Sequence, residues 1–139
     1  MVNVAPVGRL LAIATAFGVG WVVYMIGVLT AYDGVLSLLF QPIMAVFCSG
    51  FTVLLALLVG LVLRLPPLAR IWNASAFWAF AVAGASQFFL IFGYSLGLTD
   101  VGTHPETKQQ IVMLHPAVAV GGYFFLLFSI ANWPIRRSA

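Results

Sequence analysis

The chain has 139 residues, of which 63% are hydrophobic and 6% are charged, and its mean hydropathy is +1.13. A soluble domain carries about 25% charged residues, so this composition excludes an ordinary soluble domain and a disordered segment. The formal net charge is +3, from basic residues scattered along the chain. Nucleic-acid binding needs basic residues clustered on one face and is excluded too. The composition predicts an integral membrane protein.

The first apolar run covers 10–31 and follows Arg9. It is longer than the roughly 7–15 apolar residues of a secretory signal and long enough to cross about 30 Å of hydrocarbon. We therefore predict a retained first membrane helix. The Tyr32-Asp33-Gly34 sequence that follows predicts a tight turn, since glycine and aspartate favour turn conformations.

The second apolar run extends from Val35 to Leu63 and contains Pro42. The residue before a proline is biased away from helical angles, so we predict a short outer segment up to Gln41 and a spanning helix over 42–63. A single kinked helix through Pro42 is the alternative.

The third and fourth spans are predicted over 76–98 and 111–133. Thr103 to Glu106 matches a capping box, which predicts that the fourth helix begins before the membrane. Pro116 then lies inside that helix, where it removes one backbone hydrogen bond and predicts a kink. The sequence therefore predicts an all-α integral membrane protein: a single domain over 1–139 with four antiparallel transmembrane helices and kinks near Pro42 and Pro116.

The basic residues predict the orientation of this bundle. If four helices alternate in direction, one side of the membrane receives Arg9, Arg64, Arg70, Arg136 and Arg137. The other side receives Lys108 together with Asp33, Asp100 and Glu106. Basic residues favour the cytoplasmic side, so we predict that both termini are cytoplasmic and that the protein lies in a bacterial cytoplasmic membrane.

Small residues follow one face of each predicted helix, at steps of three and four. Because lipid gives no hydrophobic drive between helices, such stripes are typical of close helix contacts. The stripes are Ala12, Ala16, Gly20, Gly27 and Ala31; Ala45, Ser49, Thr52, Ala56 and Gly60; Ala76, Ala79, Ala83, Ser86, Gly93 and Gly97; and His115, Ala119, Gly122 and Ser129. We predict packing contacts at the glycines Gly20, Gly27, Gly60, Gly93, Gly97 and Gly122. The alternative is chance, since a chain rich in alanine and glycine produces such stripes easily.

No Asp, Glu, Lys or Arg lies deep in a predicted span. Intramembrane charges mark proton and ion paths, so their absence argues against a proton-coupled pump, a voltage sensor and a membrane aspartyl protease. The remaining candidates for a ligand site or solute path form a polar group in the outer half of the bundle: Gln41, Ser86, Gln87, Tyr94 and His115. The alternative, which we favour, is that these side chains only join helices by hydrogen bonds.

His115 is the most distinctive of these candidates. We place it about one turn inside the fourth helix, where it could bind haem, hydrogen-bond a quinone or relay a proton. A haem held by two histidines of one chain would need a second histidine at membrane depth, and His104 lies in a predicted loop. We favour a histidine bonded to a neighbouring helix, with haem shared between protomers as the alternative. The loop residues Asp100, His104 and Glu106 are weak metal candidates, and we predict no metal site.

Three functions remain. The first is a small structural or accessory subunit that associates with other membrane subunits or with itself. The second is a small oligomeric channel or transporter for a neutral or weakly charged solute. The third is a redox or quinone-linked subunit using His115. We rank them in that order and favour no enzymatic activity, because no catalytic pattern is present.

Overall fold

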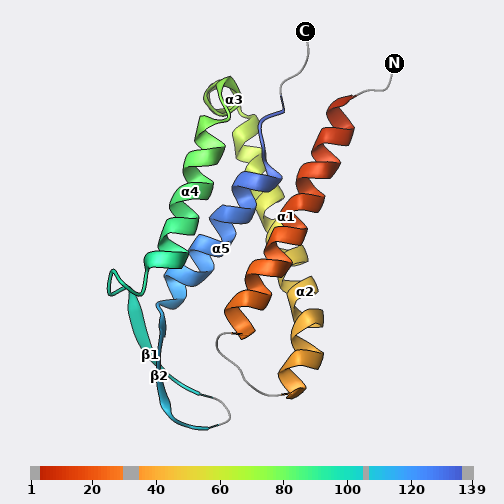
Figure 1. Cartoon of the computed structure of the whole chain (residues 1–139). Coiled ribbons are helices and arrows are strands. Elements are labelled where there is room, and N and C mark those ends of the chain that lie inside the picture. Colours follow the sequence, from red (N-terminus) through yellow and green to blue (C-terminus); the bar gives the residue numbers. More distant parts are fainter. Residues whose placement is uncertain (1–3, 30–34, 105–106, 136–139) are drawn as a thin grey trace.

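The computed structural model describes residues 4–29, 35–104 and 107–135. It is mostly helical, with one small antiparallel hairpin (Figure 1). The elements in chain order are α1 (Val4–Leu29), α2 (Val35–Gly60), η1 (Leu61–Arg64), α3 (Pro66–Ala74), α4 (Phe77–Phe92), β1 (Thr99–Thr103), β2 (Gln110–Leu114) and α5 (Pro116–Ala131).

The α5 helix is the centre of the bundle. It packs against α1, α2 and α4, and α1 also packs along α2. Its Leu127 and Ala131 form the buried core together with Ala16 of α1 and Val53 of α2. The α4 helix has its main partner in α5, so much of its surface faces outward.

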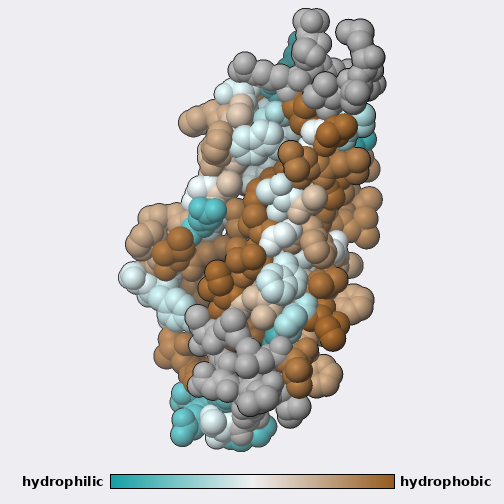
Figure 2. All heavy atoms as spheres, turned by 45° about the vertical axis from the view of Figure 1, so that its right-hand side comes forward, coloured by the Kyte–Doolittle hydropathy of each residue, from teal (hydrophilic) through white to brown (hydrophobic). Residues whose placement is uncertain are grey.

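Two helical segments are long and apolar enough to cross a membrane, Pro6–Val28 and Leu39–Arg64. The α3 and α4 helices pass the same test together, but they are bent by 79° relative to each other. The described residues therefore hold two or three candidate spans. Apolar side chains cover most of the helical surface in Figure 2, whereas hydrophilic residues are fewer and lie at both ends and in small spots between them. This distribution is typical of a membrane protein, in which lipid solvates apolar faces.

Small residues make up most of the buried positions. The buried members of the predicted stripes are Ala16, Gly20, Ala45, Ser49, Ala56, Gly60, Ala79, Ser86, Gly93 and Ser129. Larger buried side chains are fewer, and Leu126 and Leu127 are the largest of those with almost no exposure. The helix backbones can therefore approach closely, which is how helices associate where lipid surrounds them.

The predicted packing glycines fall into two groups. A methyl group at Gly20, Gly60, Gly93 or Gly122 would meet a side chain of another element. At Gly27 it would meet nothing within 4 Å. Gly97 lies outside the helices and has a φ of +72°, a left-handed conformation that favours glycine, so this glycine serves a turn.

The contact between α4 and α5 yields a testable prediction at two adjacent glycines. A Cβ atom at Gly122 would lie 2.9 Å from Leu90 Cδ2, whereas one at Gly121 would meet nothing within 4 Å. We expect Gly122→Val to lower the free energy of unfolding by about 1–2 kcal/mol relative to Gly121→Val, because overpacking displaces neighbours. Unfolding in detergent micelles measures the difference. Equal stabilities of the two variants would contradict this contact.

The two prolines behave differently from the sequence prediction. The α2 helix continues through Pro42 without a break, so the short separate segment ending at Gln41 is wrong and the single-helix alternative describes the chain. Pro116 is the first residue of α5, so the predicted kink inside the fourth helix is also wrong. A proline fits a first helical position because its missing N–H would have no partner there.

The fourth helix is shorter than predicted because residues before it form a strand. Instead of a helix over 111–133, β2 covers Gln110–Leu114 and pairs antiparallel with β1, with Val101 opposite Val112. The predicted third span likewise ends early. The α4 helix stops at Phe92, and after further turns the Leu98 N–H donates to the Gly93 carbonyl at 2.9 Å. With Gly97 in the left-handed region, this bond closes a Schellman motif that ends the helical turns.

Candidate functional site

A tyrosine hydroxyl joins three helices in the middle of the bundle. Tyr123 on α5 donates to the Gly20 carbonyl of α1 at 3.0 Å, and its oxygen lies 3.0 Å from Ser49 Oγ of α2. Ser49 is fully buried. Both hydroxyls therefore find protein partners where lipid could supply none. We did not single out Tyr123 from the sequence, although its place beside Gly121-Gly122 in an apolar run was a usable signal.

A second polar junction lies at Pro42, between α1 and α2. The Trp21 indole N–H donates to the Pro42 carbonyl at 3.1 Å, and the Tyr24 hydroxyl donates to Gln41 Oε1 at 3.1 Å. Gln41 is therefore a helix-joining residue in this structure. The two bonds also hold α2 against α1 at the position where proline removes a backbone hydrogen-bond donor.

The third junction surrounds Asn132, just after α5. Its side-chain amide donates to the backbone carbonyls of Ala56 and Phe128, at 3.0 Å each. The backbone carbonyl of Asn132 accepts a hydrogen bond from the Trp72 indole at 2.7 Å. The Asn132 side chain also occupies the space that a methyl group at Gly60 would fill. Asn132 therefore links α2, α3 and α5. It was not among the candidate site residues predicted from the sequence.

The remaining candidates for a solute path do not converge. The buried Ser86 hydroxyl donates to the Val82 carbonyl of its own helix at 2.7 Å. Gln87 and Tyr94 are exposed. An apolar groove of about 510 Å³ lies between α1 and α2. Its lining consists of Leu10, Ile13, Ala14, Phe17, Gly50, Val53, Leu54 and Leu57, and contains none of the five candidates.

His115 is the N-cap of α5 and does not lie one turn inside it. The position before a proline disfavours helical angles, so the helix starts after this residue. Its Nδ1 accepts a hydrogen bond from the Ala117 N–H at 3.2 Å, and its side chain is exposed. The cap satisfies one of the unpaired donors at the helix start. Only Nε2 remains for a haem, a quinone or a proton.

The weak metal candidates do not form a cluster among the described residues. No group of three His, Cys, Asp or Glu side chains placed to hold a metal ion occurs there. Asp100 Oδ1 accepts from the Val101 N–H at 2.8 Å, and His104 Nδ1 accepts from the Thr107 N–H at 3.2 Å. Glu106, which the sequence predicts to be part of a capping box, lies outside the described residues.

The β1–β2 hairpin has unpaired strand edges and exposed apolar side chains. It forms a sheet of two strands, so each strand has one edge that no other described strand covers. Val101 and Val112 are 63% and 62% exposed and lie opposite each other. The β2 sequence, Gln-Ile-Val-Met-Leu, carries no charge and no proline, the two features that usually protect an edge strand.

Comparison of the chain with models of protein families found no match, and neither did comparison with curated proteins or with solved structures.

Proposed function

We propose that this protein is a small structural or accessory subunit of a membrane assembly, and that a strand of a different chain pairs with the free edge of β2. The observation that carries the proposal is this uncharged edge at the end of a membrane bundle. An isolated two-stranded hairpin is marginally stable, and an open edge offers unpaired N–H and C=O groups to another strand.

Helix lengths support the need for a partner. The α5 helix has 16 residues and spans about 24 Å, less than the roughly 30 Å of a hydrocarbon core. The α4 helix also has 16 residues, and the turns that follow it up to Gly97 lengthen this segment. The α1 and α2 helices have 26 residues each and span about 39 Å. We infer that four passes are completed only if the base of the hairpin enters the membrane. Open strand edges are not tolerated in lipid, so another protein must cover β2.

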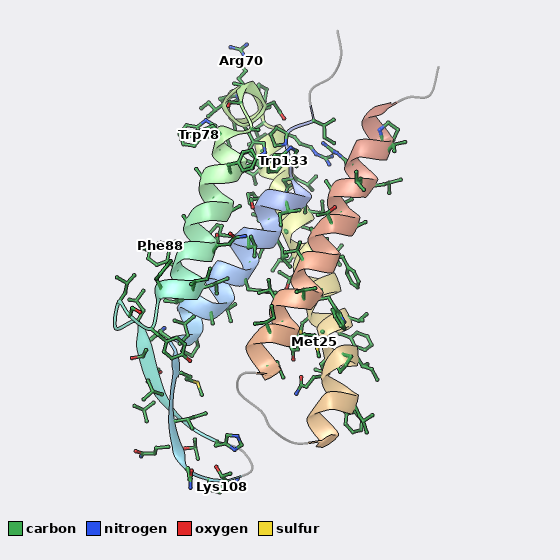
Figure 3. The ribbon with its side chains drawn as sticks, viewed as in Figure 1. Met25, Arg70, Trp78, Phe88, Lys108 and Trp133 are labelled. Atoms are coloured by element: carbon green, nitrogen blue, oxygen red, sulfur yellow. The ribbon has the colours of Figure 1, made fainter. Side chains whose placement is uncertain are left out.

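The arrangement of the ends supports the predicted topology. The start of α1, the end of α5 and the α3 helix lie at one end of the bundle, and the hairpin lies at the other (Figure 1). Arg70 and Lys108 mark these opposite ends in Figure 3. We propose that the end with Arg70 is cytoplasmic, because three of the four described basic residues, Arg9, Arg64 and Arg70, lie toward that end, and that the membrane is a bacterial cytoplasmic membrane.

A second copy of this chain fits the β2 edge less well than a different chain does. Copies in one membrane orientation are related by an axis along the bilayer normal. The two strands of the hairpin run roughly in the direction of the bundle axis (Figure 1), so a two-fold axis would place two β2 strands parallel and at equal height. A parallel ladder has slanted bonds between staggered residues, which exact two-fold symmetry does not provide.

A charge on β2 tests the proposal. We expect Val112→Lys to reduce the fraction of protein recovered in its native complex by about tenfold or more, because burying an unpaired charge in an interface costs several kcal/mol. Thr107→Lys places the same charge in the hairpin loop and should leave that fraction unchanged. Native gel electrophoresis after mild extraction measures both. Equal recovery of the two variants would contradict docking at β2.

A further inference from the structure

A short amphipathic helix, α3, crosses the end of the bundle opposite to the hairpin. It begins at Pro66-Pro67 and is bent by 79° from α4. Its position at that end is visible in Figure 1. These residues lie between the predicted spans over 42–63 and 76–98, so the expected four-helix pattern does not account for a helix across the bundle axis.

The rotation of α3 about its own axis is fixed by Trp72. The indole donates to the Asn132 carbonyl at 2.7 Å, and its ring meets Phe128 edge-to-face at a centroid distance of 5.9 Å. With that side held against α5, several large apolar side chains at the start and middle of the helix remain exposed: Leu65, Leu68 and Ile71. Arg70 points away from the bundle in Figure 3.

The described charged side chains at this end are all basic. Arg64 precedes α3 and Arg70 lies within it, and both are exposed. The acidic residue that the structure describes, Asp100, lies on β1, in the hairpin at the opposite end. Exposed apolar side chains next to exposed arginines, on a helix across a bundle end, match the chemistry of a helix that lies in the membrane interface.

We propose that α3 binds anionic phospholipids of the bilayer that holds the protein. In this arrangement Leu65, Leu68 and Ile71 contact the upper acyl chains. Arg64 and Arg70 contact the headgroup phosphates, with their aliphatic stems lying along the apolar surface. The tie between Trp72 and Asn132 keeps the helix at this depth. The proposal does not depend on which protein covers the hairpin.

The depth of α3 can be measured with spin labels on the full chain in bilayers. Cys48 is the only native cysteine, so Cys48→Ser provides a background for single labels at Ile71→Cys and Asn73→Cys. Residues two apart lie on roughly opposite sides of a helix. We expect the label at position 71 to collide mainly with oxygen dissolved in lipid and the label at 73 mainly with a water-soluble nickel complex. Equal accessibility at the two positions would overturn the interfacial placement.

Lipid selectivity tests the role of the arginines. The full chain is reconstituted in phosphatidylcholine containing about one part in four of phosphatidylglycerol, a composition that gives the bilayer a negative surface potential. Native mass spectrometry then gives the ratio of retained lipids. We expect a fall of about fivefold in the retained anionic lipid for each arginine removed in Arg64→Gln and Arg70→Gln. Lys108→Gln, at the opposite end, should not change the ratio. An unchanged ratio in the arginine variants, an equal fall with Lys108→Gln, or displacement of the lipid by inorganic phosphate would overturn the proposal.

Discussion

Gly20→Val is expected to destabilise the protein by about 3 kcal/mol relative to Gly18→Val. A Cβ atom at Gly20 would lie 2.7 Å from Leu127 Cδ1 and 3.0 Å from the Tyr123 hydroxyl, whereas one at Gly18 would meet nothing within 4 Å. Leu127 is fully buried, so its side chain cannot relieve the clash by turning out to the surface without unpacking the core. The valine must therefore separate α1 from α5 and break the bond from Tyr123 to the Gly20 carbonyl.

Both glycine variants gain the same helix propensity, so their difference isolates the contact. The measurement is the free energy of unfolding in detergent micelles, followed by the loss of helical circular dichroism. A difference below about 0.5 kcal/mol, the usual size of a surface effect, would show that α1 does not pack on α5 at Gly20.

Leu127→Ala is the second large effect, with an expected loss of about 3 kcal/mol. Leu127 of α5 is fully buried against α1 and α2. Truncation of its side chain leaves a cavity beside Ala16 and Val53. Phe125→Ala removes a larger apolar side chain from the same helix, but that side chain is 52% exposed. Lipid or detergent replaces its contacts, so this control should lose less than about 1 kcal/mol.

The double variant Gly20→Val, Leu127→Ala sharpens this prediction. The alanine removes the atom that the valine would meet first, so we expect the double variant to be more stable than the sum of the two losses predicts. Residues in contact couple by about 0.5–3 kcal/mol. Strict additivity would contradict the contact between these two positions, and a Phe125→Ala loss as large as that of Leu127→Ala would contradict the burial pattern.

The parts of the fold that sequence reasoning could predict were the features repeated along each helix. The composition predicts a membrane protein. The small-residue stripes contain buried residues on α1, α2, α4 and α5, such as Ala16, Ser49, Ala79 and Ser129. Close approach of helices requires small side chains at regular steps, so part of this packing is predictable from a single sequence, although a methyl group at Gly27 or Gly97 would meet nothing within 4 Å. Which helix lies at the centre depends on pairing between helices, and no periodicity within one helix reports that.

The hairpin and the two prolines could not be predicted in the same way. The Ile111–Leu114 segment is apolar and continuous with the following apolar run, so it fits a buried helix as well as a strand. The rule for residues before a proline also had opposite outcomes. It holds at His115, where α5 begins after it, and fails at Gln41, where contacts from Trp21 and Tyr24 support a continuous helix.

The residues of the candidate site could not be predicted either, because their roles depend on contacts between elements that are distant in sequence. His115 was expected inside a helix, and the strand before it makes it a cap instead. Tyr123 and Asn132 each join three elements, but their partners are distant in sequence, so no local motif marks them. Their importance appears only when α5 is placed between α1, α2 and α3.

The most direct test of the proposed function is native mass spectrometry of the full chain after gentle extraction from its own membrane. We expect one defined complex, with a different membrane protein at a fixed stoichiometry, that dissociates when Val112 is replaced by lysine. A lone monomer, or an assembly of this chain with itself that survives Val112→Lys, would contradict an accessory subunit that docks through β2.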